Sequence, residues 1–201
     1  MELDQAVRRR RMVRAFADRP VAPEVVDRIL DRARHAPSAG YSQGFDFLVL
    51  EGASQTSVLW EAVSTPDWRS TSDRWPGLSA APVVVLPLAH EQAYLDRYSE
   101  PDKAAAGLQE AESWPVPFWL VDTSFATMLV LLGAVEEGLG ACFFGLFRGQ
   151  EEALTALGVP AGHRPIGAVA LGWPDPERDR PSPSLARGRR PFEETVHRGR
   201  W

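Results

Sequence analysis

Cysteine and histidine are scarce in this chain of 201 residues, which contains one cysteine, Cys142, and four histidines. A single cysteine excludes an intramolecular disulfide. The histidines are scattered and none has metal-ligand spacing, so neither a structural zinc site nor any other metal site is predicted. Cys142 lies in an apolar run and is predicted to be a small buried hydrophobe rather than a nucleophile.

The sequence also lacks a positive net charge and a long charge-free apolar run. The formal net charge is -5 and the pI is about 5.4, which argues against binding to nucleic acid or to an anionic membrane. No signal-peptide-like apolar segment opens the chain, so a cytoplasmic protein is expected. The most apolar stretch, Val116 to Val135, contains Asp122, and the charge-free run that follows is shorter than the roughly 20 residues that span a bilayer. It is predicted to be a buried helix.

Helices and strands are mixed along the chain without strict βαβ alternation, which predicts an α+β fold. Predicted helices run from Leu3 to about Met12, Pro23 to Ala36, Ser54 to Val63, His90 to Tyr98, about Pro117 to Glu137, and Gln150 to Leu157. Predicted strands run from Phe45 to Leu50, Pro82 to Leu88, Ala141 to Leu146, and Ile166 to Gly172. Residues 1–201 are expected to form one domain. Its proline-rich end, from about residue 174 to 201, is predicted to be an arm that reaches over another surface such as a partner subunit.

Two familiar motifs occur in the wrong structural context. The segment GYSQG, Gly40 to Gly44, matches the nucleophile elbow of serine hydrolases, but a helix precedes it and a strand follows it, which reverses the required order. A hydrolase acting through Ser42 is therefore a remote alternative. The segment GLGACF, which begins at Gly138, lacks the third glycine of a dinucleotide fingerprint and enters a strand instead of a helix, so a Rossmann site is rejected.

Arginine is concentrated near the two ends of this acidic chain. The first cluster comprises Arg8, Arg9, Arg10, Arg11 and Arg14, and the second comprises Arg187, Arg189 and Arg190. If the two clusters fold to one place, their guanidinium groups could bind the phosphate of a cofactor. The alternative for the first cluster is a solvated face of a helix.

Five segments in order along the chain resemble the nitroreductase family of FMN-dependent oxidoreductases. They are RRMVRAF from Arg10, APSAGYSQGFDFLVL from Ala36, GLGACFFGLF from Gly138, PIGAVALGWP from Pro165, and ARGRRPFEETVHRGRW from Ala186. The resemblance implies an α+β sandwich in which a mixed, mainly antiparallel sheet is flanked by helices. It also implies an intertwined homodimer, with FMN at the interface between residues of both subunits.

The resemblance also implies roles for particular residues. The implied cofactor-binding residues are Arg10, Arg11, Met12, Arg14, Pro37, Ser38, Ala39, Gly40, Gln43, Phe144, Gly145, Arg187 and Arg189. In this reading the arginines lie near the phosphate, the ribityl chain and the pyrimidine ring, and Arg14 stabilises negative charge on the reduced flavin. The loop from Pro37 to Gln43 lies along the ring, and the backbone of Phe144 and Gly145 lies near its reactive nitrogen. No catalytic acid or nucleophile is required from the protein, because the cofactor carries the chemistry.

The sequence departs from the family pattern at several of these positions. Met12 stands where the family usually has serine, and Tyr41 where it usually has asparagine; Gly44 and Phe45 replace the usual proline and tryptophan. Tyr41 is expected to narrow the substrate pocket or to stack on a substrate. Trp68, Trp75 and Trp114 are further candidates for that pocket, and packing is the alternative for each.

The expected activity is transfer of electrons from NAD(P)H to an electron-poor small molecule, such as a nitroaromatic or a quinone, by a ping-pong mechanism. Related reactions remain alternatives: flavin cleavage, dehalogenation and heterocycle dehydrogenation. A flavin-binding protein without turnover and a deazaflavin cofactor also stay open. The sequence does not choose between NADH and NADPH.

Overall fold

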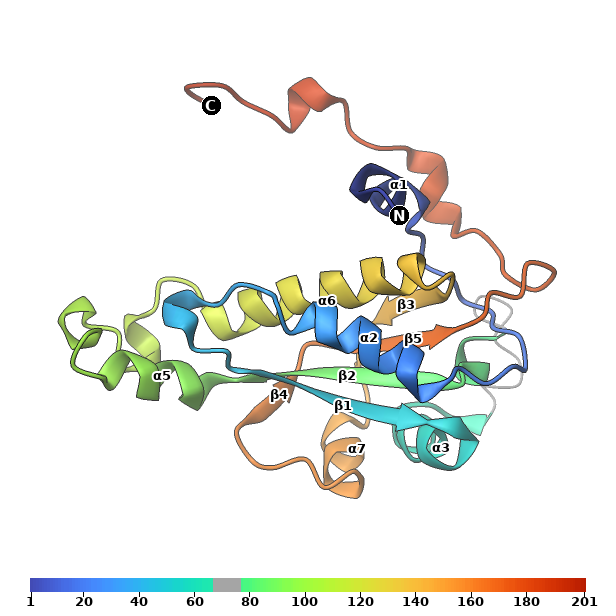
Figure 1. Cartoon of the computed structure of the whole chain (residues 1–201), viewed down its shortest axis with the longest axis horizontal. Helices are drawn as coiled ribbons and strands as arrows, with labels where there is room; N and C mark the ends of the chain where they lie inside the picture. The colour runs from blue at the N-terminus through green and yellow to red at the C-terminus, as the bar shows by residue number, and fades with distance from the viewer. Residues whose placement is uncertain (67–76) are drawn as a thin grey trace.

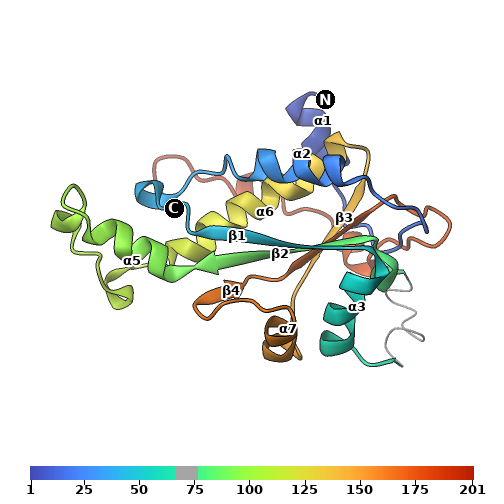
Figure 2. The same cartoon turned by 60° about the horizontal axis from the view of Figure 1, so that its bottom comes forward.

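The structure is a computed structural model that describes residues 1–66 and 77–201 (Figure 1). Trp68 and Trp75 lie outside the described residues. The described chain forms one antiparallel sheet with helices on both faces (Figures 1 and 2). A C-terminal tail extends from this body (Figure 1). The α+β class and the mainly antiparallel sheet predicted from the sequence are confirmed.

The sheet is built around one continuous apolar strand. Its strands are β1 (Phe45–Glu51), β2 (Val83–His90), β3 (Gly140–Phe144), β4 (His163–Pro165) and β5 (Ala168–Gly172). The order is β1-β2-β5-β3, and β4 also pairs with β2. Seven of the eight residues of β2 are buried, because helices cover both faces of the sheet.

Pro87 lies at the point where β2 changes its neighbour. Val83 to Val85 pair with β5, whereas Leu88 to His90 pair with β4. Proline cannot donate a ladder hydrogen bond, so it is tolerated in a central strand only at such a break.

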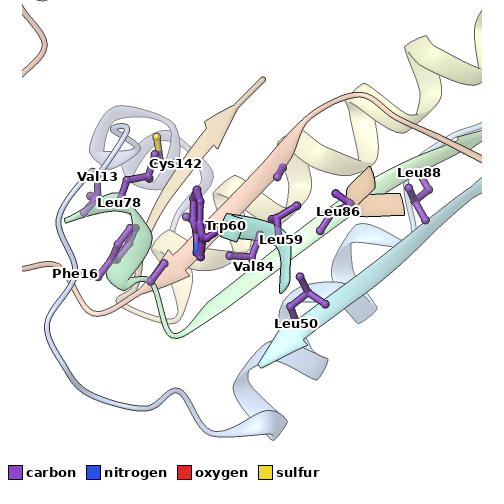
Figure 3. Packing of buried hydrophobic residues seen from close by; sticks show 14 residues of the cluster. Val13, Phe16, Leu50, Leu59, Trp60, Leu78, Val84, Leu86, Leu88 and Cys142 are labelled. Carbon is purple, nitrogen blue, oxygen red and sulfur yellow. The ribbon is translucent and has the colours of Figure 1, made fainter. Parts of the chain in front are cut away.

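Two pairs of helices cover the two faces of the sheet. The first pair is α2 (Pro23–Ala33) and α6 (Phe118–Glu136), whose Ile29 and Val130 pack with Val83 and Val85 of β2. The second pair is α3 (Gly52–Val63) and α7 (Gln150–Ala156) on the opposite face. Figure 3 shows Leu59 and Trp60 of α3 over Val84 and Leu86, the alternate residues of β2.

Helix α6 is the longest described helix and combines a buried face with an exposed apolar one. Within the described residues it is the one helix that is long and apolar enough to cross a membrane, and half of its most apolar window is buried inside the protein. It packs against α2 and against β1, β2 and β3, so it is a core helix, as the sequence predicted. Phe125 and Met128 nevertheless stay about half exposed, at 48% and 47%.

Some predicted boundaries were wrong. Helix α1 (Leu3–Arg9) ends before Met12, because Arg10 adopts extended dihedrals and Met12 pairs with Ala141. Strand β4 was missed, because three residues of mixed polarity carry no strand pattern. Helix α5 (Glu91–Ser99) agrees with the helix expected from His90 to Tyr98. Short 3-10 turns follow it, in the segment expected to be a loop.

Candidate functional site

A cavity lies between the end of α3 and the segment that follows β3. It has a volume of about 790 Å³. Its wall is mainly aromatic and aliphatic, with Trp60, Leu78 and Phe144 among the lining residues, and Figure 3 shows Trp60, Leu78 and Cys142 in this region. The rings of Trp60 and Phe144 stack with centroids 5.3 Å apart, which gives the cavity a flat apolar side.

Three residues predicted to bind the cofactor line this cavity together: Arg14, Phe144 and Gly145. Arg14 and Arg148 add positive charge to the wall, and Glu61 adds one carboxylate. A cavity of this composition suits a flat, mainly apolar ring that carries negative charge at one edge.

The backbone around Arg14 is fixed by its neighbours on both sides. Val13 donates its N–H to the Ala141 carbonyl at 2.9 Å, and Ala15 and Phe16 form isolated bridges to Gly77 and Pro174. The N–H of Arg14 donates to Asp179 Oδ1 at 2.8 Å, and its guanidinium donates to the Met12 carbonyl at 3.0 Å. Arg14 therefore projects from an extended segment that is anchored along its length.

Cys142 lines the cavity but has the properties of a buried thiol. Its side chain is 3% exposed, and burial raises its pKa to about 11. The thiol is therefore neutral at physiological pH, as predicted for a small buried hydrophobe, and does not offer a nucleophile.

Met12 packs inward and does not line the cavity. Its thioether accepts a hydrogen bond from the Phe143 N–H at 3.3 Å, and the side chain contacts both large core clusters. The Met12 side chain therefore packs between the N-terminal segment and β3.

The loop of residues 37–43 is held by a network of buried and half-buried polar groups at the start of α6. The carboxylate of Asp122, which is 2% exposed, accepts from the Ala39 N–H and from the Tyr94 hydroxyl, both at 2.8 Å. Burial, and then the bond to Asp122, raise the pKa of Tyr94 far above its usual value, so its hydroxyl remains a donor. Arg97 donates to the Gly40 carbonyl at 2.9 Å.

This loop also stores backbone strain. Gly40, Tyr41 and Gln43 all have positive φ, at 62°, 59° and 50°. The left-handed region is costly for a residue such as tyrosine, and strain of this kind concentrates at functional loops. The N–H of Gln43 donates to Ser38 Oγ at 2.9 Å, which helps to fix the conformation.

The loop and the Arg14 segment lie at opposite ends of α6. Ala39 is bonded to Asp122 near the start of this helix, whereas the Arg14 segment pairs with Ala141, just beyond its end. The intervening residues of α6 span about 20 Å at 1.5 Å per residue. No residue of the loop lines the described cavity, and both views place the loop beside α5, far from the N-terminal segment.

The remaining predicted arginines are not gathered at the cavity. Arg11 forms an ion pair with Asp179 at 3.1 Å, and Arg10 is half-buried without lining the cavity. Arg187 and Arg189 are exposed on the tail and make no hydrogen bond or ion pair within the described part of the chain. Neither Arg187 nor Arg189 lines the described cavity, and the phosphate-binding role of the tail stays a prediction.

The residues proposed for the substrate pocket and for a nucleophile are also dispersed. Tyr41 is 77% exposed. Trp114 is buried among Tyr94, Tyr98 and Trp119, and its indole donates to the Leu108 carbonyl, so it packs a satellite core beside α5. Ser42 donates to the Ala39 carbonyl at 2.6 Å, and the described structure provides it with no basic partner.

Several candidate residues were missed by the sequence analysis. Trp60, Phe147 and Arg148 join the cavity wall, and Asp122 anchors the loop. An aspartate inside an apolar helix was the one visible signal, since a buried carboxylate requires donors. Trp60 and Arg148 carried no signal, because their contribution depends on tertiary packing, whereas Phe147 closes the motif GLGACFFGLF.

Comparison with known proteins agrees with this architecture. The sequence profile of the nitroreductase family matches residues 7–173. A provisionally named NADH dehydrogenase/NAD(P)H nitroreductase from Archaeoglobus fulgidus is 29% identical over 174 residues, covering 85% of this chain and 84% of that protein. A chloronitrobenzene nitroreductase from Comamonas testosteroni is 26% identical over 198 residues, covering 86% of this chain and 87% of that protein.

The fold agrees as well. A provisionally named nitroreductase from Desulfovibrio desulfuricans, solved in complex with FMN, superposes with a TM-score of 0.69 at 23% identity and covers 98% of this chain and 95% of that chain. At 23% identity, the structural similarity shows only that the fold is shared. The sequence profile, however, spans most of the chain in its own right, and the protein belongs to the nitroreductase family.

Proposed function

We propose that this protein is an FMN-dependent oxidoreductase that passes electrons from NAD(P)H to an electron-poor small molecule by a ping-pong mechanism. The observation that carries the proposal is the aromatic cavity in which Arg14 lies with Phe144 and Gly145. The names of the relatives support it, since they include NAD(P)H and chloronitrobenzene nitroreductases and a structure with FMN. A nitroaromatic or quinone acceptor fits the flat apolar wall.

The residues of the cavity fit such a cofactor. When bound, FMN supplies hydride acceptance and electron release. Arg14 places a fixed positive charge where negative charge develops, and its anchored backbone keeps that charge in position. Trp60 and Phe144 exclude water from one side of the cavity and offer a flat surface to a ring. Arg187 and Arg189 are proposed to reach the phosphate from the tail.

We further propose that two copies of the chain assemble each site. The loop of residues 37–43 cannot reach the Arg14 cavity of its own chain across α6, whereas a second copy could present its loop there. The exposed apolar residues Phe125 and Met128 on α6, and Leu185 and Phe192 on the tail, supply surface for such a contact. Burial of that surface would stabilise a homodimer. Tyr41 of the loop would then lie at the substrate side of the site.

The lone buried Cys142 and the acidic composition fit a cytoplasmic enzyme supplied with NAD(P)H, and this location is part of the proposal. The proposed acceptor is a small molecule, and neither nucleic acid nor a membrane is a proposed partner.

Anaerobic reduction of the purified protein tests the activity. We expect NADH or NADPH to bleach the visible flavin band, and a nitroaromatic or quinone to restore it in a separate step. Dithionite is the control, since it reduces bound flavin whatever the physiological donor is. A flavin that dithionite reduces but neither nicotinamide reduces would contradict the proposal, and would favour a flavin-binding protein without turnover or another reaction of this fold.

A further inference from the structure

Two histidines and an aspartate meet on the sheet, outside the cavity described above. They are Asp46 of β1, His90 at the end of β2 and His163 at the start of β4, and one potential ligand atom from each lies within 4.8 Å of the others. His163 Nε2 is 3.2 Å from Asp46 Oδ2. The imidazole rings of His90 and His163 lie with centroids 4.3 Å apart.

The strand register explains why these side chains meet. His90 is directly opposite His163, and Asp46 is directly opposite Leu88, which is two residues from His90. Directly opposed residues and residues two apart on one strand share a face of a sheet. All three side chains therefore project from one face, across the three neighbouring strands β1, β2 and β4.

The donor set suits a borderline divalent transition metal. Imidazole and carboxylate groups bind Zn²⁺, Ni²⁺ and Cu²⁺, whereas Ca²⁺ and Mg²⁺ prefer oxygen ligands only. Metal–ligand bonds of about 2.0–2.2 Å require the three groups to move closer together. Asp46 can move, because its side chain is 58% exposed. The ring of His90, which stacks on that of His163 at an interplanar angle of 24°, must also turn so that a nitrogen of each ring points at the ion. Water can fill the remaining coordination positions.

The environment of His163 decides which ring nitrogen a cation would meet. Its side chain is 16% exposed, and its Nδ1 atom is buried with no hydrogen-bond partner in the described residues. The Nε2 atom faces Asp46, so Nε2 is the nitrogen that can bind an ion shared with that carboxylate. Burial of the rest of the ring limits its movement and keeps Nε2 directed at Asp46.

We propose that Asp46, His90 and His163 bind one Zn²⁺ ion, or a divalent metal of similar chemistry, and that the ion fastens the short strand β4 to β2 and β1. This site departs from the expectation of no metal drawn from the sequence. It is independent of the proposed redox function, because none of the three residues lines the Arg14 cavity.

Calorimetric titration of the untagged, flavin-loaded full chain with ZnCl₂ tests the proposal. We expect one saturable site in the native protein. The variants His163→Gln and Asp46→Asn should weaken binding by about tenfold or more, since loss of a ligand costs at least as much as loss of a supporting group. His35→Gln is the matched control, because His35 is an exposed histidine at the end of α2, outside the cluster, and it should leave binding unchanged.

A second readout identifies the ligands. With Cu²⁺ in place of Zn²⁺, the electron paramagnetic resonance spectrum should show coupling to imidazole nitrogen, and His90→Gln should reduce that coupling. Asp46→Asn changes a mostly exposed side chain, so it tests the site even if a histidine variant misfolds. Absence of Zn²⁺ binding by the native chain, or equal binding by Asp46→Asn and His35→Gln, would overturn the proposal. Neither result depends on whether the flavin is reduced by a nicotinamide.

Discussion

At the scale of single residues, Asp122 is the group that positions the strained loop. Its carboxylate accepts from a backbone N–H of the loop and from a buried tyrosine hydroxyl, and it is almost fully buried, so water cannot readily replace either donor. The loop therefore keeps three residues in the left-handed region because α6 and α5 fix it from outside. A carboxylate inside an apolar helix thus fixes the loop that we propose to complete the FMN site of a second copy.

Replacement of this carboxylate should be costly. We expect Asp122→Ala to lower the free energy of unfolding by about 3 kcal/mol, because one buried and one half-buried donor lose a charged acceptor. Urea denaturation measures the change, and Tyr94→Phe is the comparison that removes one of the two bonds and should cost less. A change below about 0.5 kcal/mol for Asp122→Ala would show that the network contributes nothing measurable.

At the scale of elements, α2 is tied to the end of α6 by charge as well as by packing. Glu137 accepts from Arg28 and from Arg32 at 2.7 Å each, and its side chain is 12% exposed. The hydrogen bond from Arg28, followed by the one from Arg32, lowers the pKa of the Glu137 carboxyl below its usual 4.5. These cations also lie at the negative end of the α6 dipole.

The two ion pairs of Glu137 make the stability of the folded protein depend on pH. A carboxyl whose pKa is lower in the folded state stabilises the protein above its unfolded pKa, and this contribution is lost as the pH falls through the folded value. We therefore expect Glu137→Gln to destabilise the protein at pH 7 and to match the native protein progressively below about pH 4.5. Thermal unfolding across this range measures the difference. Glu110→Gln, at an exposed acid, is the control, and an equal effect of Glu137→Gln at pH 7 and at pH 3 would contradict the account.

The same scale shows what a sequence can reveal about structure. The run of valines in β2 and the apolar stripe of α2 identify these elements. A short continuous apolar run is typical of a strand buried on both faces, and apolar residues three or four apart are typical of a helix buried on one face. Strand β4 could not be predicted, since its three residues owe their conformation to β2 alone. The extended segment around Met12 was likewise predicted to be helical, and pairing with β3 overrode its helix-compatible composition.

At the scale of the whole molecule, the order of the motifs along the chain predicted the family. The fold then brings some of the motif residues together in space. Arg14, Phe144 and Gly145 line one cavity although 130 residues separate the first two in sequence. The meeting of Asp46, His90 and His163 had no sequence signal, because it depends on register across three strands. The separation of the loop from the cavity was equally invisible, because it depends on the length and direction of α6.

We propose that the Arg14 segment of one copy and the 37–43 loop of the other complete a single FMN site. The two parts can be damaged separately, by Arg14→Glu in one chain and by Gln43→Glu in the other. Each variant alone should lose FMN, because each substitution adds negative charge to every site of its homodimer.

The decisive measurement is the FMN content of a mixed dimer purified from cells that express both variants with different affinity tags. In a shared site, one of the two sites receives an undamaged Arg14 and an undamaged loop. We therefore expect recovery of about half of the native FMN per chain, since charge complementarity is restored in that site alone. A mixed dimer without FMN would contradict the account, as would full retention of FMN by either variant alone.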